Sequence, residues 1–416
     1  MWFLLASAMA APPTRFPDRG AVVAAVLAEP SFRTVAEGGS LAEAGRLRGE
    51  AALAPLMLEA GWAPLATHMP GVDVRASWML PAPAMRAAAG RAAGSAEQMA
   101  AADGDMAEVE VAARASRLFD EAWAVLQAAH VLDHHADTLA EAQASVARRV
   151  AAGLLRADQR VMAQMEEVLL AEERLRWAAR GRLAVAELDE LGAVGAAADL
   201  RALLAAGVAR FEGGAEPADL ALPADPGPVL LGAAPAASPS VRAAEAEGGM
   251  AAAMGQMAAA EGRPMAGVMA GYSSMWADPE MALMVGVEVE VPLDVAAIRA
   301  RRAGAEAQAR AAEAGVERER AGAAGEAARA ASMAEEAAAM ERLMAERMLP
   351  LAEERARLTR LGFEAGAGTL EVWLAAEREL AHARLRTLET RAERRGAEAM
   401  VAMARGQRAG IPEESP

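Results

Sequence analysis

The order of elements along this chain repeats, and the repeat constrains the fold more than any other feature. Three landmarks return 209 to 213 residues later: Pro30 as Pro239, Leu80-Pro81 as Val291-Pro292, and Ala152-Gly153 as Ala365-Gly366. Because a repeated order indicates a duplicated unit, the two halves are expected to fold alike. Each half is predicted to contain a helix, a short β segment, a very long helix, a break at glycine and another long helix.

The composition favours long helices over ordinary globular domains. The 416 residues are enough for two or three domains, but aromatic residues make up only 3% of them. Alanine dominates, and chains rich in Ala, Glu, Leu and Arg with helical periodicity are typical of long helices and coiled coils. The net charge of −16 argues against a nucleic-acid partner, which needs a basic face. The absence of cysteine excludes disulfides, thiolate metal sites and cysteine nucleophiles.

The first residues resemble the end of a secretory signal. Residues 1–10 are apolar and finish in Ala8-Met9-Ala10, which has the pattern of a cleavage site, although no positively charged region precedes them. We therefore assign residues 1–28 to a partial signal and N-terminal segment. No later segment has 18 uncharged apolar residues in a row, so no transmembrane helix is predicted.

Seven-residue spacing predicts the long helices. Apolar residues recur without a miss at Leu118, Val125, Leu132, Leu139 and Val146. A helix from about 85 to 150 would be roughly 100 Å long, far more than a compact domain needs. After Gly153 the same spacing continues at Leu154, Val161, Val168 and Leu175, which predicts an antiparallel second helix.

The second half is predicted to follow the same plan. A helix is expected over 240–261, a long helix over 294–362 with a kink at Pro350, and a last helix over 369–405. In the first half, a helix is expected over 30–60. Residues 211–237 hold a run of prolines and are predicted to be a linker between the halves.

Between the helices the period of the sequence changes from helical to alternating. Apolar and polar residues alternate over 72–80 and over 284–291, and the stretch 62–70 before the first of these has only a weak strand pattern. We divide the chain into a first repeat, 29–210, with a β segment at 62–80 and a tip near 153. The second repeat, 238–408, has a β hairpin at 264–292 and a tip near 366, and 409–416 form a tail.

The alternation gives each strand one apolar and one polar face, and Glu288 and Glu290 lie on the polar side. In a membrane barrel the apolar face contacts lipid and the polar face lines water. Spanning strands need about 9–11 residues, close to the length of these segments. Because open sheet edges are not tolerated in lipid, so small a sheet must close by oligomerising.

The chain resembles the TolC-like outer-membrane efflux proteins, particularly the CzcC-like branch associated with RND pumps. The resemblance covers nearly everything after residue 25. It is carried by the internal duplication and by four segments: Ser238 to Ala246, Gly286 to Leu293, Leu349 to Glu353, and Ala365 to Arg378.

This resemblance implies a mainly α protein with a small β part. Duplicated helical hairpins would form a trimeric α-barrel conduit in the periplasm, and four strands per chain would contribute to a shared 12-strand outer-membrane β-barrel. It also implies a homotrimer that docks on a periplasmic adaptor (membrane fusion) protein and an inner-membrane RND pump. Such a channel passively exports heavy-metal cations or other small molecules and is not an enzyme.

Two groups of residues are candidates for functional sites in this interpretation. Glu288 and Glu290 are the candidates for lining the lumen. The resemblance places Gly153 and Gly366 at the periplasmic tips, where both glycines also suit helix C-caps. Asp158 and Glu371 each follow five residues later and are the nearest candidates for an acidic aperture.

Two further clusters have competing interpretations. His130 and His134 are one helical turn apart, which suits a shared metal ion, but a solvated helix face explains them equally and no third ligand is evident. Methionines gather around the second hairpin at positions 250, 254, 257, 265, 269, 275, 281 and 284. Thioethers prefer Cu(I), whereas methionine also serves as simple apolar filling. We predict no cofactor and no dedicated metal site.

Two alternatives to the channel remain open. A soluble coiled-coil scaffold without transport activity would also need long helices, with the β segments as a small cap. A degenerate paralogue would retain the pattern without the function. No catalytic constellation, P-loop or H-E-x-x-H motif is present, so an enzyme is not predicted.

Overall fold

The computed structural model describes residues 15–52, 57–63, 71–80, 82–192, 194–212, 223–229, 237–273 and 283–411. The chain divides into two compact units, and each takes segments from both halves of the sequence. One unit comprises Ser31–Ala107 and Ala237–Ala323, and the other comprises Met1–Pro30, Glu108–Ala236 and Ala324–Pro416. We call them the sheet unit and the hairpin unit.

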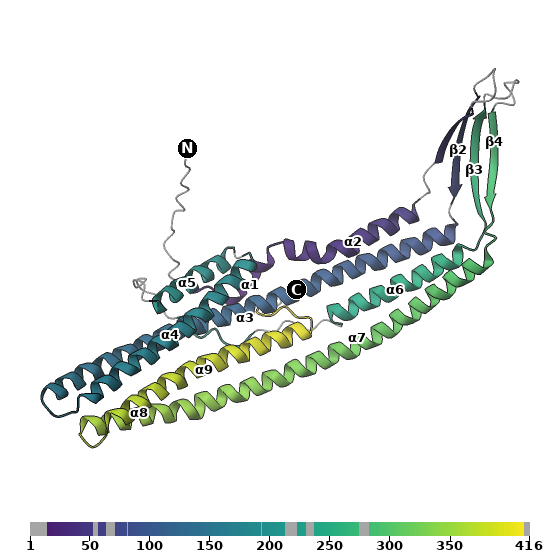
Figure 1. Ribbon diagram of the computed structural model, residues 1–416. Helices are drawn as coiled ribbons and strands as arrows, with labels where there is room; N and C mark the ends of the chain where they lie inside the picture. The colour runs from purple at the N-terminus through teal and green to yellow at the C-terminus, as the bar shows by residue number, and fades with distance from the viewer. Residues whose placement is uncertain are drawn as a thin grey trace, which may run out of the picture. The chain divides into compact units, whose positions relative to one another are not determined.

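The sheet unit contains a four-stranded antiparallel sheet in the order β1-β2-β3-β4 (Figure 1). The strands are β1 (Met57–Ala63), β2 (Gly71–Leu80), β3 (Met265–Ser273) and β4 (Leu283–Glu290). Strands β1 and β2 come from the first half and β3 and β4 from the second. The two hairpins are joined by pairing between β2 and β3, so the repeated elements form one sheet.

The helices of the sheet unit pack through alanine. They are α2 (Ser31–Ala51), the start of α3 (Pro83–Ala151), α6 (Pro239–Ala260) and the start of α7 (Val295–Leu343). Their buried cluster is Ala44, Leu47, Ala92, Ala93, Ala96 and Ala253. Such small side chains let helix backbones approach closely, which explains the alanine-rich composition.

The hairpin unit is built from long antiparallel helices. Besides the rest of α3 and α7 it contains α1 (Arg19–Leu27), α4 (Asp158–Glu190), α5 (Ala196–Phe211), α8 (Leu349–Glu364) and α9 (Leu370–Ala404). The predicted seven-residue row from Leu118 to Val146 is buried throughout, so it does form a core seam. No helix among the described ranges is both long enough and apolar enough to cross a bilayer.

The predictions for the first β segment were partly wrong. The helix expected over 30–60 ends at Ala51, and a strand begins at Met57, not at 62. Residues 64–70 lie outside the described residues. The β1 sequence contains alanine and glycine, which have little intrinsic strand preference. Pairing with β2 along its whole length, from Met57 opposite Ser77 to Ala63 opposite Gly71, decides its structure.

The helix is irregular just before Pro350, where a kink was expected. A short π-helix, η1 (Met344–Met348), separates α7 from α8, and Pro350 lies in the first turn of α8. Proline has no N–H to donate and its ring crowds the carbonyl four residues back, so the preceding turn widens.

Two segments assigned no fold are ordered and packed. Residues 1–14 lie outside the described residues, but Arg19–Leu27 form a helix that is N-capped by Asp18 and buries Val22, Val23 and Val26. Within the predicted linker, residues 223–229 pack against α3 and α9, with Val229 buried beside Ala113 and Ala399. The linker is therefore held to the helices over this stretch.

The two halves nevertheless follow the same order of elements. Helix α2, hairpin β1–β2, helix α3 and helix α4 correspond in order to α6, β3–β4, α7 with α8, and α9. The second-half helices match the predicted ranges closely, since α6 covers 239–260 and α9 covers 370–404. A mainly α chain with a small antiparallel sheet is thus confirmed.

Candidate functional site

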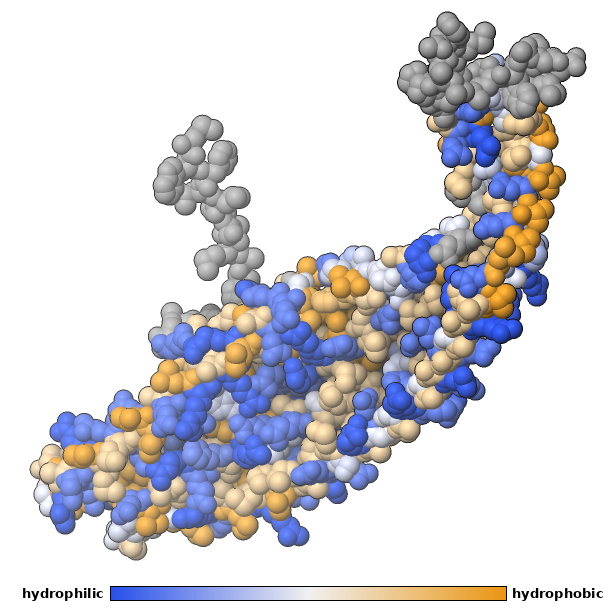
Figure 2. Space-filling view, turned by 45° about the vertical axis from the view of Figure 1, so that its right-hand side comes forward, coloured by the Kyte–Doolittle hydropathy of each residue, from blue (hydrophilic) through white to orange (hydrophobic). Residues whose placement is uncertain are grey.

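The sheet has one continuous apolar face. Because side chains alternate along a strand, the strand register brings one set of residues to the same side. This apolar face comprises Leu58, Val74, Ala76, Trp78, Leu80, Ala266, Val268, Ala270, Tyr272, Leu283, Val285, Val287 and Val289. Val285 and Val287 are 79% and 74% exposed, so nothing in the described chain covers them. Apolar residues form a continuous band along the sheet in Figure 2.

The opposite face carries the candidate lumen residues. Glu288 and Glu290 are exposed there and lie opposite Gly267 and Met265 of β3. On the same face Glu59 of β1 lies opposite Arg75 of β2. All the charged residues of the strands lie on this face and none lies on the apolar face, so the two faces suit different solvents.

Both edges of the sheet are open within the described residues. Strand β1 pairs only with β2, and β4 pairs only with β3. A strand edge presents a row of unpaired N–H and C=O groups, which pair readily with another chain. An isolated sheet with two open edges and one exposed apolar face therefore needs partners for its edges and for that face.

Helix α4 carries two seven-residue rows, and only one of them meets its own chain. Ala163, Leu170, Trp177 and Ala184 are buried. The row predicted from the sequence as the continuing seam is exposed: Val161, Val168 and Leu175 of α4 at 56%, 68% and 60%, and Leu154, in the turn before α4, at 74%. We call it the outer row of α4. Helix α8 has a similar pattern, because Ala352 and Ala356 are buried while Leu351 and Leu358 are exposed.

The two predicted tips have the same backbone geometry. Gly153 and Gly366 have φ of 72° and 75°, in the left-handed region that glycine adopts without a steric penalty. Each N–H donates to the carbonyl three residues back, and the next N–H donates to the carbonyl five residues back. This is the Schellman cap, so the prediction that both glycines are helix C-caps is confirmed.

The tips also touch each other. The Nη1 of Arg149, at the end of α3, donates to the carbonyl oxygen of Phe363 near the end of α8 at 3.3 Å. The same guanidinium lies 4.5 Å from the centroid of the Phe363 ring. Phe363 also stacks on Trp373 of α9, with ring centroids 5.0 Å apart. The first hairpin is thereby fixed against the second.

The candidate aperture carboxylates lie at the starts of the returning helices. Asp158 is the first residue of α4 and pairs with Arg156 at 3.0 Å. Glu371 lies exposed in the first turn of α9, beside the N-cap Thr369. A carboxylate in the first turn interacts favourably with the helix dipole, so a structural role is already satisfied at both positions.

The candidate metal pair is not assembled into a site. His130 and His134 are exposed on α3, and the described residues offer no group of three His, Asp or Glu placed to hold a metal ion. The neighbouring His135, which was not part of the candidate pair, is buried next to His382 and Arg378. Burial, with His382 and His134 adding to it, lowers the pKa of His135 to about 4, so its ring is neutral near pH 7.

The methionine cluster divides into two groups. Met250, Met254 and Met257 lie half-buried on α6, and Met250 packs on the alanine cluster. Met275 and Met281 fall outside the described residues. The remaining three, Met265, Met269 and Met284, lie on the polar face of the sheet.

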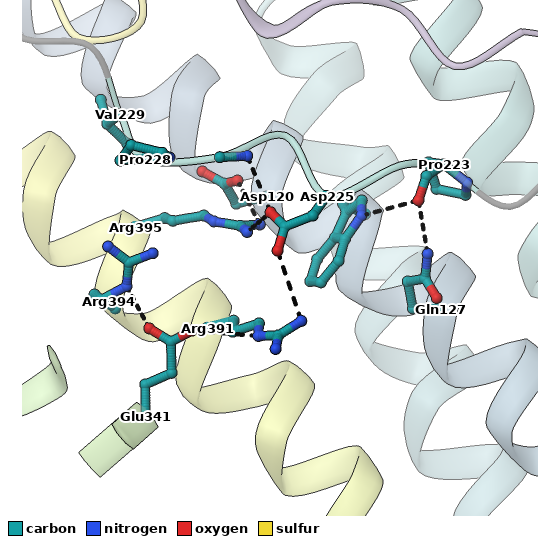
Figure 3. A network of polar contacts seen from close by, with 12 residues as sticks. Asp120, Gln127, Pro223, Asp225, Pro228, Val229, Glu341, Arg391, Arg394 and Arg395 are labelled. Atoms are coloured by element: carbon teal, nitrogen blue, oxygen red, sulfur yellow. Dashed lines mark hydrogen bonds and ion pairs between the residues drawn. The ribbon is translucent and has the colours of Figure 1, made fainter. Parts of the chain in front are cut away.

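A buried polar network holds the ordered part of the linker in the hairpin unit (Figure 3). Asp120 of α3 pairs with Arg19 at 2.5 Å and with Arg395 of α9 at 3.5 Å, and all three are buried. Arg395 also pairs with Asp225 and lies over the Trp123 ring at 4.6 Å.

Carbonyl oxygens of the linker complete this network. The carbonyl of Pro223 accepts hydrogen bonds from Gln127 at 2.8 Å and Trp123 at 3.4 Å, and the Pro228 carbonyl accepts one from Arg19 at 3.0 Å. Buried charges are tolerated only when they are paired and hydrogen-bonded, as here. Nothing in the sequence pattern predicted this network.

The structure of the chain is similar to those of outer-membrane channels. A membrane protein from Pseudomonas aeruginosa is 18% identical with a TM-score of 0.71, covering 95% of this chain and 91% of that one. The open MtrE outer membrane channel of Neisseria gonorrhoeae is 18% identical with a TM-score of 0.67, covering 96% and 91%. The outer membrane protein VceC of Vibrio cholerae is 15% identical with a TM-score of 0.67, covering 93% and 95%.

Sequence comparison points to the same group. No curated protein matches the chain. Residues 230–407 match the family model described as outer membrane efflux protein. The channels of this family are transport components and not enzymes. The match to this family model is confined to residues 230–407, while over nearly its whole length the chain has the fold of the outer-membrane channels to which it is similar.

Proposed function

We propose that this chain is the outer-membrane channel subunit of a tripartite, RND-type efflux system, with a long periplasmic portion. The channel is passive and exports metal cations or small molecules from the periplasm to the exterior. The observation that carries this proposal is the four-stranded sheet, which has one exposed apolar face, one polar face and, among the described residues, two open edges. Lipid on one side and water on the other explain both faces.

Closure of the sheet requires further copies of the chain. Three copies with four strands each would make a 12-strand barrel, in which β1 of one copy pairs with β4 of the next. That arrangement leaves no edge in lipid, where an unpaired backbone group costs several kcal/mol. A soluble scaffold would have no reason to leave Val285, Val287 and Val289 exposed together.

The helices support the same homotrimer. The outer row of α4 and the exposed leucines of α8 are apolar, spaced by seven residues and uncovered by their own chain. In a trimer, the outer row of one copy packs against a neighbouring copy, as the seams of a coiled coil do. The long helical hairpins then form the periplasmic α-barrel conduit.

Within this channel each candidate site has a role. Glu288 and Glu290 line the lumen. The capped turns at Gly153 and Gly366 are the periplasmic tips that meet the adaptor protein, with Asp158 and Glu371 beside the aperture. Channels of this family work in tripartite systems with an adaptor and a pump. We therefore assign the channel no catalytic step.

Membrane fractionation of the expressed protein tests this proposal, with gel mobility compared before and after boiling. The expected result is an outer-membrane, trimer-sized band that collapses to the monomer on heating. A soluble, extended helical protein would overturn the channel and leave the coiled-coil scaffold.

A pair of matched substitutions tests the trimer contact. Val168→Glu and Gln164→Glu each add one negative charge to an exposed position of α4. We expect Val168→Glu to abolish the trimer-sized band and Gln164→Glu to leave it, because only Val168 lies in the outer row. Equal effects of both would show that the outer row does not form the contact.

A further inference from the structure

All five described methionines of the sheet lie on one face, and it is the polar one. The strand register places Met57, Met79, Met265, Met269 and Met284 on the same side as Glu288 and Glu290. The apolar face holds valine, leucine, alanine, tryptophan and tyrosine but no methionine among its described residues. If these methionines served only as apolar side chains, we would expect them on the apolar face.

Three of these methionines lie next to one another across the sheet. Met79 lies opposite Gly267, while Met269 lies opposite Ser77 on one side and Gly286 on the other. Met284 lies opposite Gly271. Met79 and Met269 are therefore diagonal neighbours, as are Met269 and Met284. Diagonal neighbours are about 7–8 Å apart, within reach of long side chains. We call these three residues the thioether stripe.

Glycines beside the stripe leave room for the side chains to lie flat on the sheet. A Cβ at Gly267 would stand 2.5 Å from the sulfur of Met79, and one at Gly286 would stand 3.1 Å from the methyl carbon of Met269. A Cβ at Gly271 would approach the methyl carbon of Met284 to 3.9 Å. Each methionine thus lies over a glycine of the adjacent strand.

The chemistry of this face suits a soft, singly charged metal ion. Thioether sulfur is a soft ligand that selects Cu(I), and Ag(I) has the same preference and charge. Glu288 of β4 lies on the same face. It is opposite Gly267 of β3, which is in turn opposite Met79 of β2. Glu288 and Glu290 raise the local concentration of cations, and the thioethers then discriminate in favour of soft ones.

We propose that the thioether stripe binds Cu(I) and Ag(I) at the water-facing side of the sheet, so that soft monovalent metal ions are among the cargo of the channel. This inference rests on the proposed function for its statement about cargo, whereas the binding itself rests on the sheet alone. The binding involves no electron transfer, since the metal stays in the +1 state and is held by sulfur lone pairs.

Silver binding to the full-length protein in detergent and chloride-free buffer tests the site. The measurement is equilibrium dialysis against Ag(I), with bound silver determined by mass spectrometry and sulfur ligation by X-ray absorption. The test variant combines Met79→Leu, Met269→Leu and Met284→Leu, which keep the volume but remove the sulfur. The control combines Met165→Leu, Met333→Leu and Met340→Leu at exposed helical positions.

We expect the stripe variant to lose silver affinity by at least about tenfold and the control to keep it. Gly286→Ala, which retains every methionine but crowds Met269, is expected to weaken binding to a smaller extent. Binding that is absent from the parent protein, or equal in the stripe variant and the control, would overturn the proposal.

The failure of this inference is distinguishable from the failure of the proposed function. A protein that conducts ions in a planar bilayer but binds no silver keeps the channel and loses the metal site. A protein that binds silver through the stripe but forms no channel keeps the metal site and loses the statement about cargo.

Discussion

Arg149 of the first helical hairpin donates a hydrogen bond to the carbonyl oxygen of Phe363 in the second, and its guanidinium lies over the Phe363 ring. The two residues are 214 positions apart, and each lies a few residues before its own tip glycine. The contact is therefore a direct link between the duplicated halves at the tips.

Replacing Arg149 should loosen this link. Arg149→Ala removes one hydrogen bond and one cation–π contact, which together contribute about 1–2 kcal/mol. Hydrogen exchange of the amides in 361–370 is expected to speed up. Arg156→Ala is the control, because Arg156 is exposed and its ion pair among the described residues is with its neighbour Asp158. Equal exchange in the two variants would contradict the link.

Alanine in place of a tip glycine and alanine in place of a glycine inside a helix are expected to change stability in opposite directions. Gly153→Ala and Gly366→Ala place a Cβ at positive φ and are each expected to cost about 1–2 kcal/mol of stability. Gly304→Ala, in the middle of α7 with open space around it, is expected to stabilise by about 0.5–1 kcal/mol. Thermal unfolding in detergent measures all three. Destabilisation by Gly304→Ala, or none by the cap variants, would contradict this account.

His135 predicts a loss of stability in acid. Its pKa is about 4 in the folded protein against 6.5 for the free group, so the unfolded chain takes up a proton first as the pH falls. The folded state therefore loses stability through the window from pH 6.5 to about 4, by roughly 3 kcal/mol in total. His135→Gln is expected to remove this part of the acid sensitivity.

Thermal midpoints at pH 7 and pH 4.5 check that expectation, with His130→Gln as the exposed control. The drop between the two pH values should be smaller for His135→Gln than for the parent protein and unchanged for His130→Gln. An unchanged drop in His135→Gln would show that burial of this ring does not govern the acid response.

Adjacent residues of β4 predict which face of the sheet meets lipid. Val287→Arg puts a charge on the apolar face, where arginine at the bilayer midplane costs about 2–4 kcal/mol. Glu288→Arg changes a residue of the polar face and should assemble normally. The yield of heat-dissociable trimer measures both. Similar yields, or a greater loss for Glu288→Arg, would contradict the assignment of the faces.

The long helices were predictable because their signal is local. A buried row such as Leu118, Val125 and Leu132 repeats at the period of the helix itself, so it needs no knowledge of the partner. The same period predicted the outer row of α4 but not that its own chain would leave it exposed. Ala163, Leu170 and Trp177 compete for the core on the same helix, and packing with the rest of the chain decides between the rows.

Other features depend on residues far apart in the sequence. Strand β1 has little preference of its own and forms because β2 pairs with it. Asp120 meets Arg19 and Arg395, which are 101 and 275 positions away, so no spacing rule reveals the network. His130 and His134 had a recognisable spacing, but His135 is the one that the fold buries.

Ionic conductance of the purified protein in a planar bilayer tests the central claim most directly. The account predicts discrete, long-lived conductance steps from the trimer-sized species and none from protein dissociated by boiling. In such a trimer the apolar face of the sheet would contact lipid, and the outer row of α4 would contact a neighbouring copy. A trimer that inserts but conducts no ions, or a protein that stays monomeric and soluble, would contradict it.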